Sequence, residues 1–417
     1  MLELNQSKLA RLSLALILIW GCNTDEARDD PVGPAPIILI SMDGFRWDYV
    51  DRVETPNFDY LSATGVTATA MIPVFPSLTF PNHLSIITGR YPENHGIVHN
   101  RMWDPLFQEW YTIGAGSVPV ADGKWYDAEP FWVTVEKAGL ISAIYHWPGS
   151  EAEIMGYRPS HYHVFDPAVT NTTKVEKVLE WLDLPPSERP SFIAIYFNEA
   201  NYYGHRLGVQ GSAMDSVIQG LDEDIGQLLT GLEQRGIVDE VNIIVVADHG
   251  MVDLDEQRVI FLDDYITLQE LEYYSLGPLS FISPPGSEVD TFYNALNNAH
   301  PNFKVYLKDA LPGHLHYGDH RRIPAIVGIP DEGWYVLTRN YFQNNGLGSY
   351  VAAHGYDPLI SSMQTIFLAA GPQFKQALTV PKFQNINLYE LMAHILELQP
   401  APNDGSLDSV RIMLANP

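Results

Sequence analysis

Short runs of apolar, largely β-branched residues recur along the chain and alternate with longer segments of helical periodicity. The clearest runs are residues 37–40, 192–197 and 243–247. Continuous runs of this kind are typical of strands buried on both faces of a parallel sheet. The clearest helix is predicted over residues 214–234, where apolar positions recur at three- and four-residue spacing. Such alternation predicts an α/β fold with crossover helices.

Weaker patterns extend the same plan towards both ends of the chain. A helix is expected directly after Thr79, and another over residues 132–139, followed by a short strand at 141–145. A buried strand at residues 364–370 and a helix at 387–398 are predicted to complete the fold. The acidic run 222–224 is interpreted as the solvated face of the long helix.

The middle of the second half has a looser pattern and is predicted to be an insert. Residues 304–307 and 334–337 are expected to form antiparallel strands within it. The predicted fold is therefore an α/β core with a mostly parallel central sheet flanked by helices, plus a smaller α+β insert. The predicted bounds are residues 37–254 and 349–417 for the core, and 255–348 for the insert, which we expect to cover the site.

The first residues have the pattern of an export signal. Lys8 and Arg11 precede an apolar stretch too short to be a permanent membrane span, so residues 1–22 are predicted to be a signal peptide. Residues 19–22 resemble a bacterial lipobox, with Cys22 as the lipidated residue. The alternative is ordinary cleavage nearby with release. We expect an exported lipoprotein that faces the periplasm or the cell surface, with residues 23–36 as a tether.

The composition excludes some chemistry. Cys22 is the only cysteine, so the mature protein has no internal disulfide and no cysteine-based zinc ribbon. Lys and Arg total 24 against 51 Asp and Glu, a formal charge of −27, which argues against a nucleic-acid duplex as the main partner. A small phosphate ester stays possible, because bound cations can reverse the local field within a site.

Polar side chains follow the predicted strands at the points where the strands end. Because ligands gather at the carboxyl ends of strands in an open α/β sheet, these side chains are expected to converge. Carboxylate and imidazole groups together suit a zinc site that keeps room for substrate. The candidate ligands are Asp43, Asn201, His205, Asp248, His249 and His354.

Two further residues are candidates for chemistry on a substrate. Thr79 precedes a predicted helix, where helix dipole and backbone N–H groups favour a developing anion, and a metal would make its hydroxyl a nucleophile. The alternative is that Thr79 only caps the helix. Asn100 could donate a hydrogen bond to a phosphoryl oxygen, or it could simply form a turn.

Taken together, these segments resemble the nucleotide pyrophosphatase/phosphodiesterase family (type I phosphodiesterases) of the alkaline phosphatase superfamily. The similar motifs follow the family's order and cover essentially the whole mature chain. They include Ile40-Ser41-Met42-Asp43-Gly44-Phe45-Arg46, the segment around Thr79, Thr88-Gly89-Arg90-Tyr91-Pro92, Trp147-Pro148-Gly149-Ser150, Ala247-Asp248-His249-Gly250-Met251 and His354-Gly355-Tyr356-Asp357.

The resemblance implies a zinc-dependent phosphodiesterase with two Zn²⁺ ions and a phospho-threonine intermediate. It implies nucleotides or related small phosphate esters as substrates, and no protein partner. The resemblance implies that Asp43, Asp248 and His249 hold one zinc, with Thr79 as the nucleophile on it, and that Asn201, His205 and His354 hold the second zinc. It also implies that Asn100 contacts the phosphoryl oxygen and that Phe80 and Tyr162 contact the substrate.

The chain departs from the family at Asn201, where the motif has an aspartate. An amide offers zinc one neutral oxygen and lacks the charge of a carboxylate, so weaker affinity is expected at the second site. Three interpretations stay open: a tolerated neutral ligand, a deliberately inactivated variant, or a natural protein that has lost turnover.

Rival functions follow from the same residues. A phosphomonoesterase or a lipid-headgroup phosphodiesterase would use the same metal core, and loss of the second zinc would leave a non-catalytic binding protein. The spacing of His314, His316 and His320 resembles that of a metal-binding site, but these histidines lie in the predicted insert and are interpreted as structural or surface residues.

Overall fold

The computed structural model describes residues 33–416. The signal peptide and Cys22 therefore lie outside the described residues. None of the helices in the described part of the chain is both long enough and apolar enough to span a membrane. The helices are α1 (Pro56–Thr64), α2 (Thr79–Thr88), α3 (Pro92–His95), α4 (Phe131–Lys137), α5 (Asn171–Leu182), α6 (Glu199–Leu207), α7 (Ser212–Arg235), α8 (Val289–Leu296), α9 (Arg339–Asn345) and α10 (Leu388–Ile395).

An eight-stranded sheet forms the centre of the fold, in the order β19-β2-β18-β9-β1-β8-β6-β7. Strand β18 is antiparallel to both of its neighbours, and the other pairs are parallel. The prediction of a mostly parallel sheet is thus confirmed. The strands are β1 (Ile37–Met42), β2 (Val66–Ala68), β6 (Ser142–Tyr145), β7 (His161–His163), β8 (Phe192–Phe197), β9 (Asn242–Val246), β18 (Phe367–Ala370) and β19 (Leu378–Val380).

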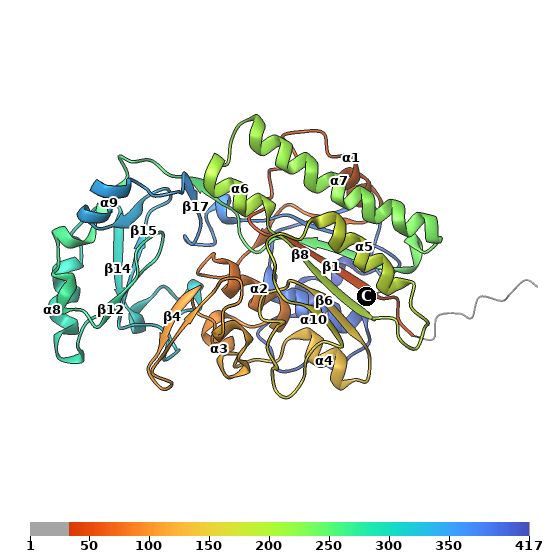
Figure 1. The fold of residues 1–417 in the computed structure, drawn as a ribbon, viewed down its shortest axis with the longest axis horizontal. Helices are drawn as coiled ribbons and strands as arrows, with labels where there is room; N and C mark the ends of the chain where they lie inside the picture. Colours follow the sequence, from red (N-terminus) through yellow and green to blue (C-terminus); the bar gives the residue numbers. More distant parts are fainter. Residues whose placement is uncertain (1–32, 417) are drawn as a thin grey trace, which may run out of the picture. The chain divides into compact units, whose positions relative to one another are not determined.

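Helices cover both faces of this sheet (Figure 1). Alternate residues of β1 enter different apolar clusters, as the two-residue period of a strand requires. Ile38 and Ile40 pack with α1, α5 and α7, whereas Ile37 and Leu39 belong to the cluster that contains α2, α4 and α10. Burial on both faces explains why the strand sequences are continuously apolar.

The acidic run in α7 is not simply a solvated face. Asp222 is only 2% exposed, and its carboxylate accepts hydrogen bonds from the backbone N–H groups of Asn57 and Phe58 at the start of α1. Helix N-termini have N–H groups without partners inside the helix, and a carboxylate satisfies them. Only Glu223 is exposed, because Asp224 is partly buried.

The segment predicted to be an insert has its own sheet, in the order β12-β13-β15-β14. One predicted pairing is wrong: β14 (Phe303–Leu307) pairs antiparallel with β15 (Ile326–Pro330), and β16 (Tyr335–Leu337) pairs in parallel with β11 (Val259–Phe261). The intervening apolar run of β15 takes the place beside β14. The remaining short strands are β3 (Met71–Ile72), β4 (Arg101–Asp104), β5 (Glu109–Thr112), β10 (Val252–Asp253), β12 (Tyr273–Tyr274), β13 (Ser280–Ser283), β17 (Ala352–Ala353) and β20 (Phe383–Gln384).

Candidate metal centre and active site

Two carboxylates and an imidazole converge at the carboxyl ends of β1 and β9. Asp43 directly follows β1, and Asp248 and His249 follow β9. The Nε2 atom of His249 lies 3.3 Å from Oδ1 of Asp43 and 3.1 Å from Oδ2 of Asp248. One ligand atom from each of the three residues lies within 4.8 Å of the other two, and all three side chains are buried.

The carboxylate oxygens at the centre of this group have no hydrogen-bond partner within residues 33–416. Asp43 Oδ1 and Asp248 Oδ2 are buried without one, whereas the outer oxygens accept from the Tyr196 hydroxyl and the Gly44 N–H. Burying anionic oxygens without partners is costly, and a cation removes the cost. This donor set therefore fits a divalent metal ion.

The pKa values of the two carboxylates are raised, because both are buried. Burial raises the pKa of Asp43 well above its ordinary value, and the adjacent Asp248 carboxylate raises it further. Burial also raises the pKa of Asp248 to about 7. A bound cation would favour the charged forms and reverse these shifts.

Three histidines present the same ring nitrogen to the site. The Nδ1 atoms of His205, His249 and His354 lie 2.8–2.9 Å from the backbone oxygens of Ala352, Gly250 and Ser77, respectively. A proton donated from Nδ1 to a carbonyl leaves Nε2 as the acceptor, and such a hydrogen bond commonly orients metal-bound histidines. Burial lowers the pKa of all three, with His205 also lowering that of His354, which falls to about 3.

A second candidate group adjoins the first. Asn201 and His205 lie one turn apart on α6, and His354 follows β17. The His354 ring is 5.1 Å from that of His205 and stacks on His249 at 3.5 Å, measured between ring centroids. Oδ1 of Asn201 is buried and has no hydrogen-bond partner in the described chain. The structure thus brings all six predicted ligands to one edge of the sheet.

Thr79 is the first residue of α2, so the predicted helix begins two residues earlier than Pro81. Its Oγ1 lies 3.2 Å from Nε2 of His249, and the side chain is 7% exposed. The residue makes no side-chain cap, because Leu78 occupies the N-cap position. Asn100 accepts the Phe80 N–H through Oδ1 at 3.0 Å, which leaves its Nδ2 protons as donors.

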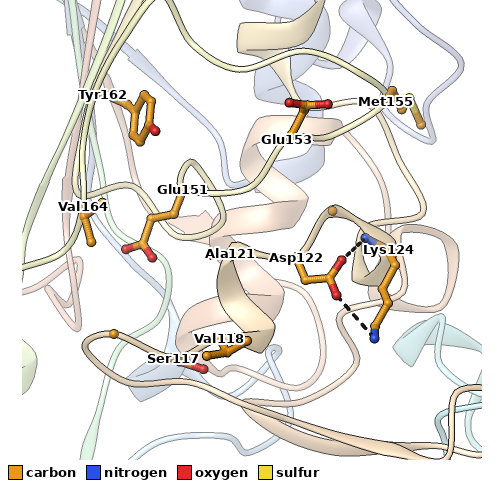
Figure 2. A pocket seen from close by; sticks show the side chains of 12 residues that line it. Ser117, Val118, Ala121, Asp122, Lys124, Glu151, Glu153, Met155, Tyr162 and Val164 are labelled. Atoms are coloured by element: carbon orange, nitrogen blue, oxygen red, sulfur yellow. Dashed lines mark hydrogen bonds and ion pairs between the residues drawn. The ribbon is translucent and has the colours of Figure 1, made fainter.

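The two predicted substrate contacts lie on different features. Phe80 is partly buried, and its ring is 6.1 Å from that of Tyr111. Tyr162 is 39% exposed and lines an open groove of about 810 Å³. Figure 2 shows Tyr162, Val164 and Glu151 on one side of this groove, opposite the pair of Asp122 and Lys124.

Three further side chains, which are not among the candidates predicted from the sequence, contact the site. His83 lies four residues after Thr79 on α2, and its Nδ1 is 3.3 Å from Oδ2 of Asp248. Ser41 is within 2.8 Å of the other ring nitrogen, and the Tyr196 hydroxyl donates to Asp43. The four-residue spacing could have revealed His83, because residues i and i+4 share a helix face.

The histidines near residue 316 have three different partners. His314 lies 3.0 Å from the carboxylate of Asp357, and His320 lies 3.2 Å from that of Asp127. His316 stacks on Tyr91 with ring centroids 4.0 Å apart. These contacts tie the segment to other parts of the fold.

Comparisons with known proteins identify the family. The family model of type I phosphodiesterases/nucleotide pyrophosphatases matches residues 37–357. The chain belongs to this family. It is 34% identical over 380 residues to human ectonucleotide pyrophosphatase/phosphodiesterase family member 5, covering 91% of this chain and 78% of the relative. It is 37% identical to a venom phosphodiesterase of Macrovipera lebetinus, covering 95% of this chain but 47% of that relative.

A solved structure agrees with this membership. An inactive threonine-to-alanine variant of murine ectonucleotide pyrophosphatase/phosphodiesterase 5, in complex with AMP, superposes with a TM-score of 0.86 at 35% identity. The alignment covers 91% of this chain and 100% of that one. The predicted family, the alkaline phosphatase-like fold and the assignment as a phosphodiesterase or nucleotide pyrophosphatase are confirmed.

Proposed function

We propose that this phosphodiesterase depends on two zinc ions and hydrolyses phosphodiester or pyrophosphate bonds of nucleotides through a phospho-threonine intermediate on Thr79. The observation that carries the proposal is the position of the Thr79 hydroxyl, 3.2 Å from His249 Nε2. That atom in turn lies beside the two unpartnered carboxylate oxygens of Asp43 and Asp248.

The six converging residues divide into two sets of three metal ligands. Asp43, Asp248 and His249 would hold the first zinc together with Thr79. The second zinc would be held by Asn201, His205 and His354. Zinc supplies Lewis acidity to a phosphoryl oxygen and lowers the pKa of a bound hydroxyl or water. The first set carries two carboxylates and the second set none, so the second zinc should bind more weakly.

The chain's own residues then determine the course of the reaction. Oγ1 of Thr79 gives up its proton to water and forms a bond to phosphorus while the bond to the leaving oxygen breaks, and that oxygen takes a proton from water. The Nδ2 protons of Asn100 donate to a phosphoryl oxygen, and the N-terminus of α2 favours the negative charge. The intermediate is a phosphodiester between Thr79 and the nucleotide. Water then attacks its phosphorus and breaks the bond to Oγ1, which releases the nucleoside monophosphate and restores the hydroxyl.

A nucleotide suits the surroundings of Thr79. Phe80 directly follows the nucleophile and is partly buried, and its ring would stack on a nucleobase held at Thr79. The groove that contains Tyr162 is a separate feature with the size of a small-molecule site. The AMP bound to the murine relative supports this substrate class.

The test is zinc-dependent hydrolysis of a nitrophenyl nucleotide diester by the purified protein, with the matching monoester in parallel. We expect diester turnover that a chelator abolishes and zinc restores, and a Thr79 peptide that carries the nucleotidyl group after rapid acid quenching. Thr79→Ala should remove both turnover and the label. Label on another residue would refute the nucleophile, and faster monoester cleavage would favour a phosphomonoesterase. Zinc binding without turnover would indicate a binding protein.

We also infer that the protein is exported and lipid-anchored through Cys22, as residues 1–22 indicate. The test is incorporation of labelled palmitate in a bacterial host, with Cys22→Ser as the control. Release of unlabelled protein from both forms would favour ordinary cleavage.

A further inference from the structure

A lysine is buried at the carboxyl end of β8, directly before the helix that carries Asn201 and His205. Lys174 is 1% exposed. Its Nζ donates to the backbone oxygen of Tyr196 at 2.9 Å and to Oδ1 of Asn171 at 3.1 Å, and it lies 5.5 Å from the Phe197 ring centroid. Lysine is almost never fully buried unless it is paired, because desolvating an ammonium group is costly.

The negative charges that act on this ammonium come from two other helices. Burial lowers the pKa of Lys174, and Glu199 on α6 and Asp224 on α7 oppose that shift. Asp224 also accepts a hydrogen bond from Asn171 at 2.8 Å. Oε2 of Glu199 is buried without a hydrogen-bond partner in the described part of the chain. Lys174 therefore lies at a junction of α5, β8, α6 and α7.

Helix geometry separates Glu199 from the metal ligands on the same helix. Asn201 and His205 are four residues apart and share one face of α6, whereas Glu199, two residues before Asn201, points to another side. The carboxylate of Glu199 can therefore interact with Lys174 while Asn201 faces the candidate metal site. The first turn of α6 is also tied to Asp43, whose backbone oxygen accepts the Asn201 N–H at 2.8 Å.

We propose that Lys174 is a positioning residue for the second metal-binding site. Its ammonium holds the end of β8 through Tyr196 and attracts Glu199, and this fixes the first turn of α6 so that Asn201 and His205 point at the same ion. The inference rests on the proposed two-zinc function. Its effect should be selective, because Lys174 contacts the end of β8 that leads into α6, whereas Asp43, Asp248 and His249 follow other strands. Tyr196 reaches Asp43 through its side-chain hydroxyl and not through the carbonyl that Lys174 holds.

The test measures zinc content per chain and the dissociation constant of each zinc by chelator competition, with the full protein. Lys174→Met removes the charge but keeps the apolar stem, and Lys174→Arg keeps the charge. Lys177→Met, which removes the partly exposed lysine paired with Glu180 on the same helix, is the matched control. Lys174→Met should weaken the weaker zinc by about tenfold to a hundredfold, the range for outer-shell partners. The tighter zinc, and both zincs of Lys177→Met, should be unchanged, and Lys174→Arg should recover part of the loss.

The alternative outcomes separate this inference from the proposed function. Two zincs with wild-type affinities in Lys174→Met would overturn the positioning role and leave the two-zinc function standing. A wild-type protein that holds fewer than two zincs overturns both. Equal weakening of both zincs would show a general loss of structure and also contradict the inference. Should Lys174→Met not fold, Glu199→Gln gives the same readout: a selective loss supports the role, and no loss refutes it.

Discussion

Replacing Asn201 by aspartate should strengthen zinc binding at the second site. None of the three proposed ligands there, Asn201, His205 and His354, is a carboxylate, and burial lowers the pKa of both histidines and so favours their neutral form. Oδ1 of Asn201 is buried and has no hydrogen-bond partner in the described chain. The substitution therefore adds a negative charge at an oxygen that accepts no hydrogen bond from the described residues. Asn and Asp have nearly the same shape, and the fold should tolerate the substitution.

The size of the effect follows from two opposing electrostatic contributions. A unit charge and a divalent ion attract by about 8 kcal/mol at roughly 4 Å and an effective dielectric constant of about 20. Burying the carboxylate costs several kcal/mol. A net gain of about 3 kcal/mol corresponds to roughly a hundredfold tighter second zinc. Turnover at limiting zinc should rise, because more molecules would hold both ions.

The assay is chelator competition with spectroscopic detection of free zinc, together with diester hydrolysis at a series of zinc concentrations. Asn340→Asp is the control, since it makes the same change in net charge on the exposed α9. An Asn201→Asp protein whose second zinc binds no more tightly than in wild type would refute the assignment of residue 201 as a ligand. Activity in Asn201→Asp alone would instead show that Asn201 impairs this chain.

Three further predictions concern the substrate, the metal-free protein and stability. Phe80→Ala should raise KM by about tenfold or more with a smaller effect on kcat, because stacking of a base on an aromatic ring contributes about 1–3 kcal/mol to binding. An unchanged KM for a nucleotide diester would contradict stacking on Phe80. In chelator, the contribution of Asp248 to stability, measured as the difference in unfolding free energy between wild type and Asp248→Asn, should fall between pH 5 and pH 8. Folded Asp248, with a pKa of about 7, retains a proton that the unfolded chain has lost above pH 4, whereas the buried histidines, whose pKa values are lowered, change the total stability in the opposite direction. Saturating zinc should remove this difference, and a contribution that grows towards pH 8 in chelator would refute it. Arg322→Met should lower the free energy of unfolding, measured in denaturant, by about 3–5 kcal/mol, because fully buried Arg322 donates to Asp104 and to two backbone oxygens. The control Arg321→Met changes a partly exposed side chain and should lower the free energy of unfolding less. Equal losses in the two variants would contradict this prediction.

Local patterns in the sequence were sufficient to place the core elements and the candidate ligands. Continuous apolar runs predicted β1, β8 and β9, because a strand buried on both faces has no polar positions. The polar residues that end these runs, such as Asp43 and Asp248, then had to meet at one edge of a parallel sheet. Helix α6, which puts Asn201 and His205 on a common face, was not among the predicted elements.

Only the tertiary structure decided which distant segments pair and which charged groups are buried. The β14–β15 pairing, the antiparallel direction of β18 and the outward position of Tyr162 depend on contacts between residues far apart in sequence. Lys174 resembles any helix-surface lysine in the sequence, yet it is buried because β8, α6 and α7 surround it with oxygen atoms. Burial and hydrogen-bond partners are properties of the packed molecule, whereas hydrophobic periodicity is a property of each segment alone.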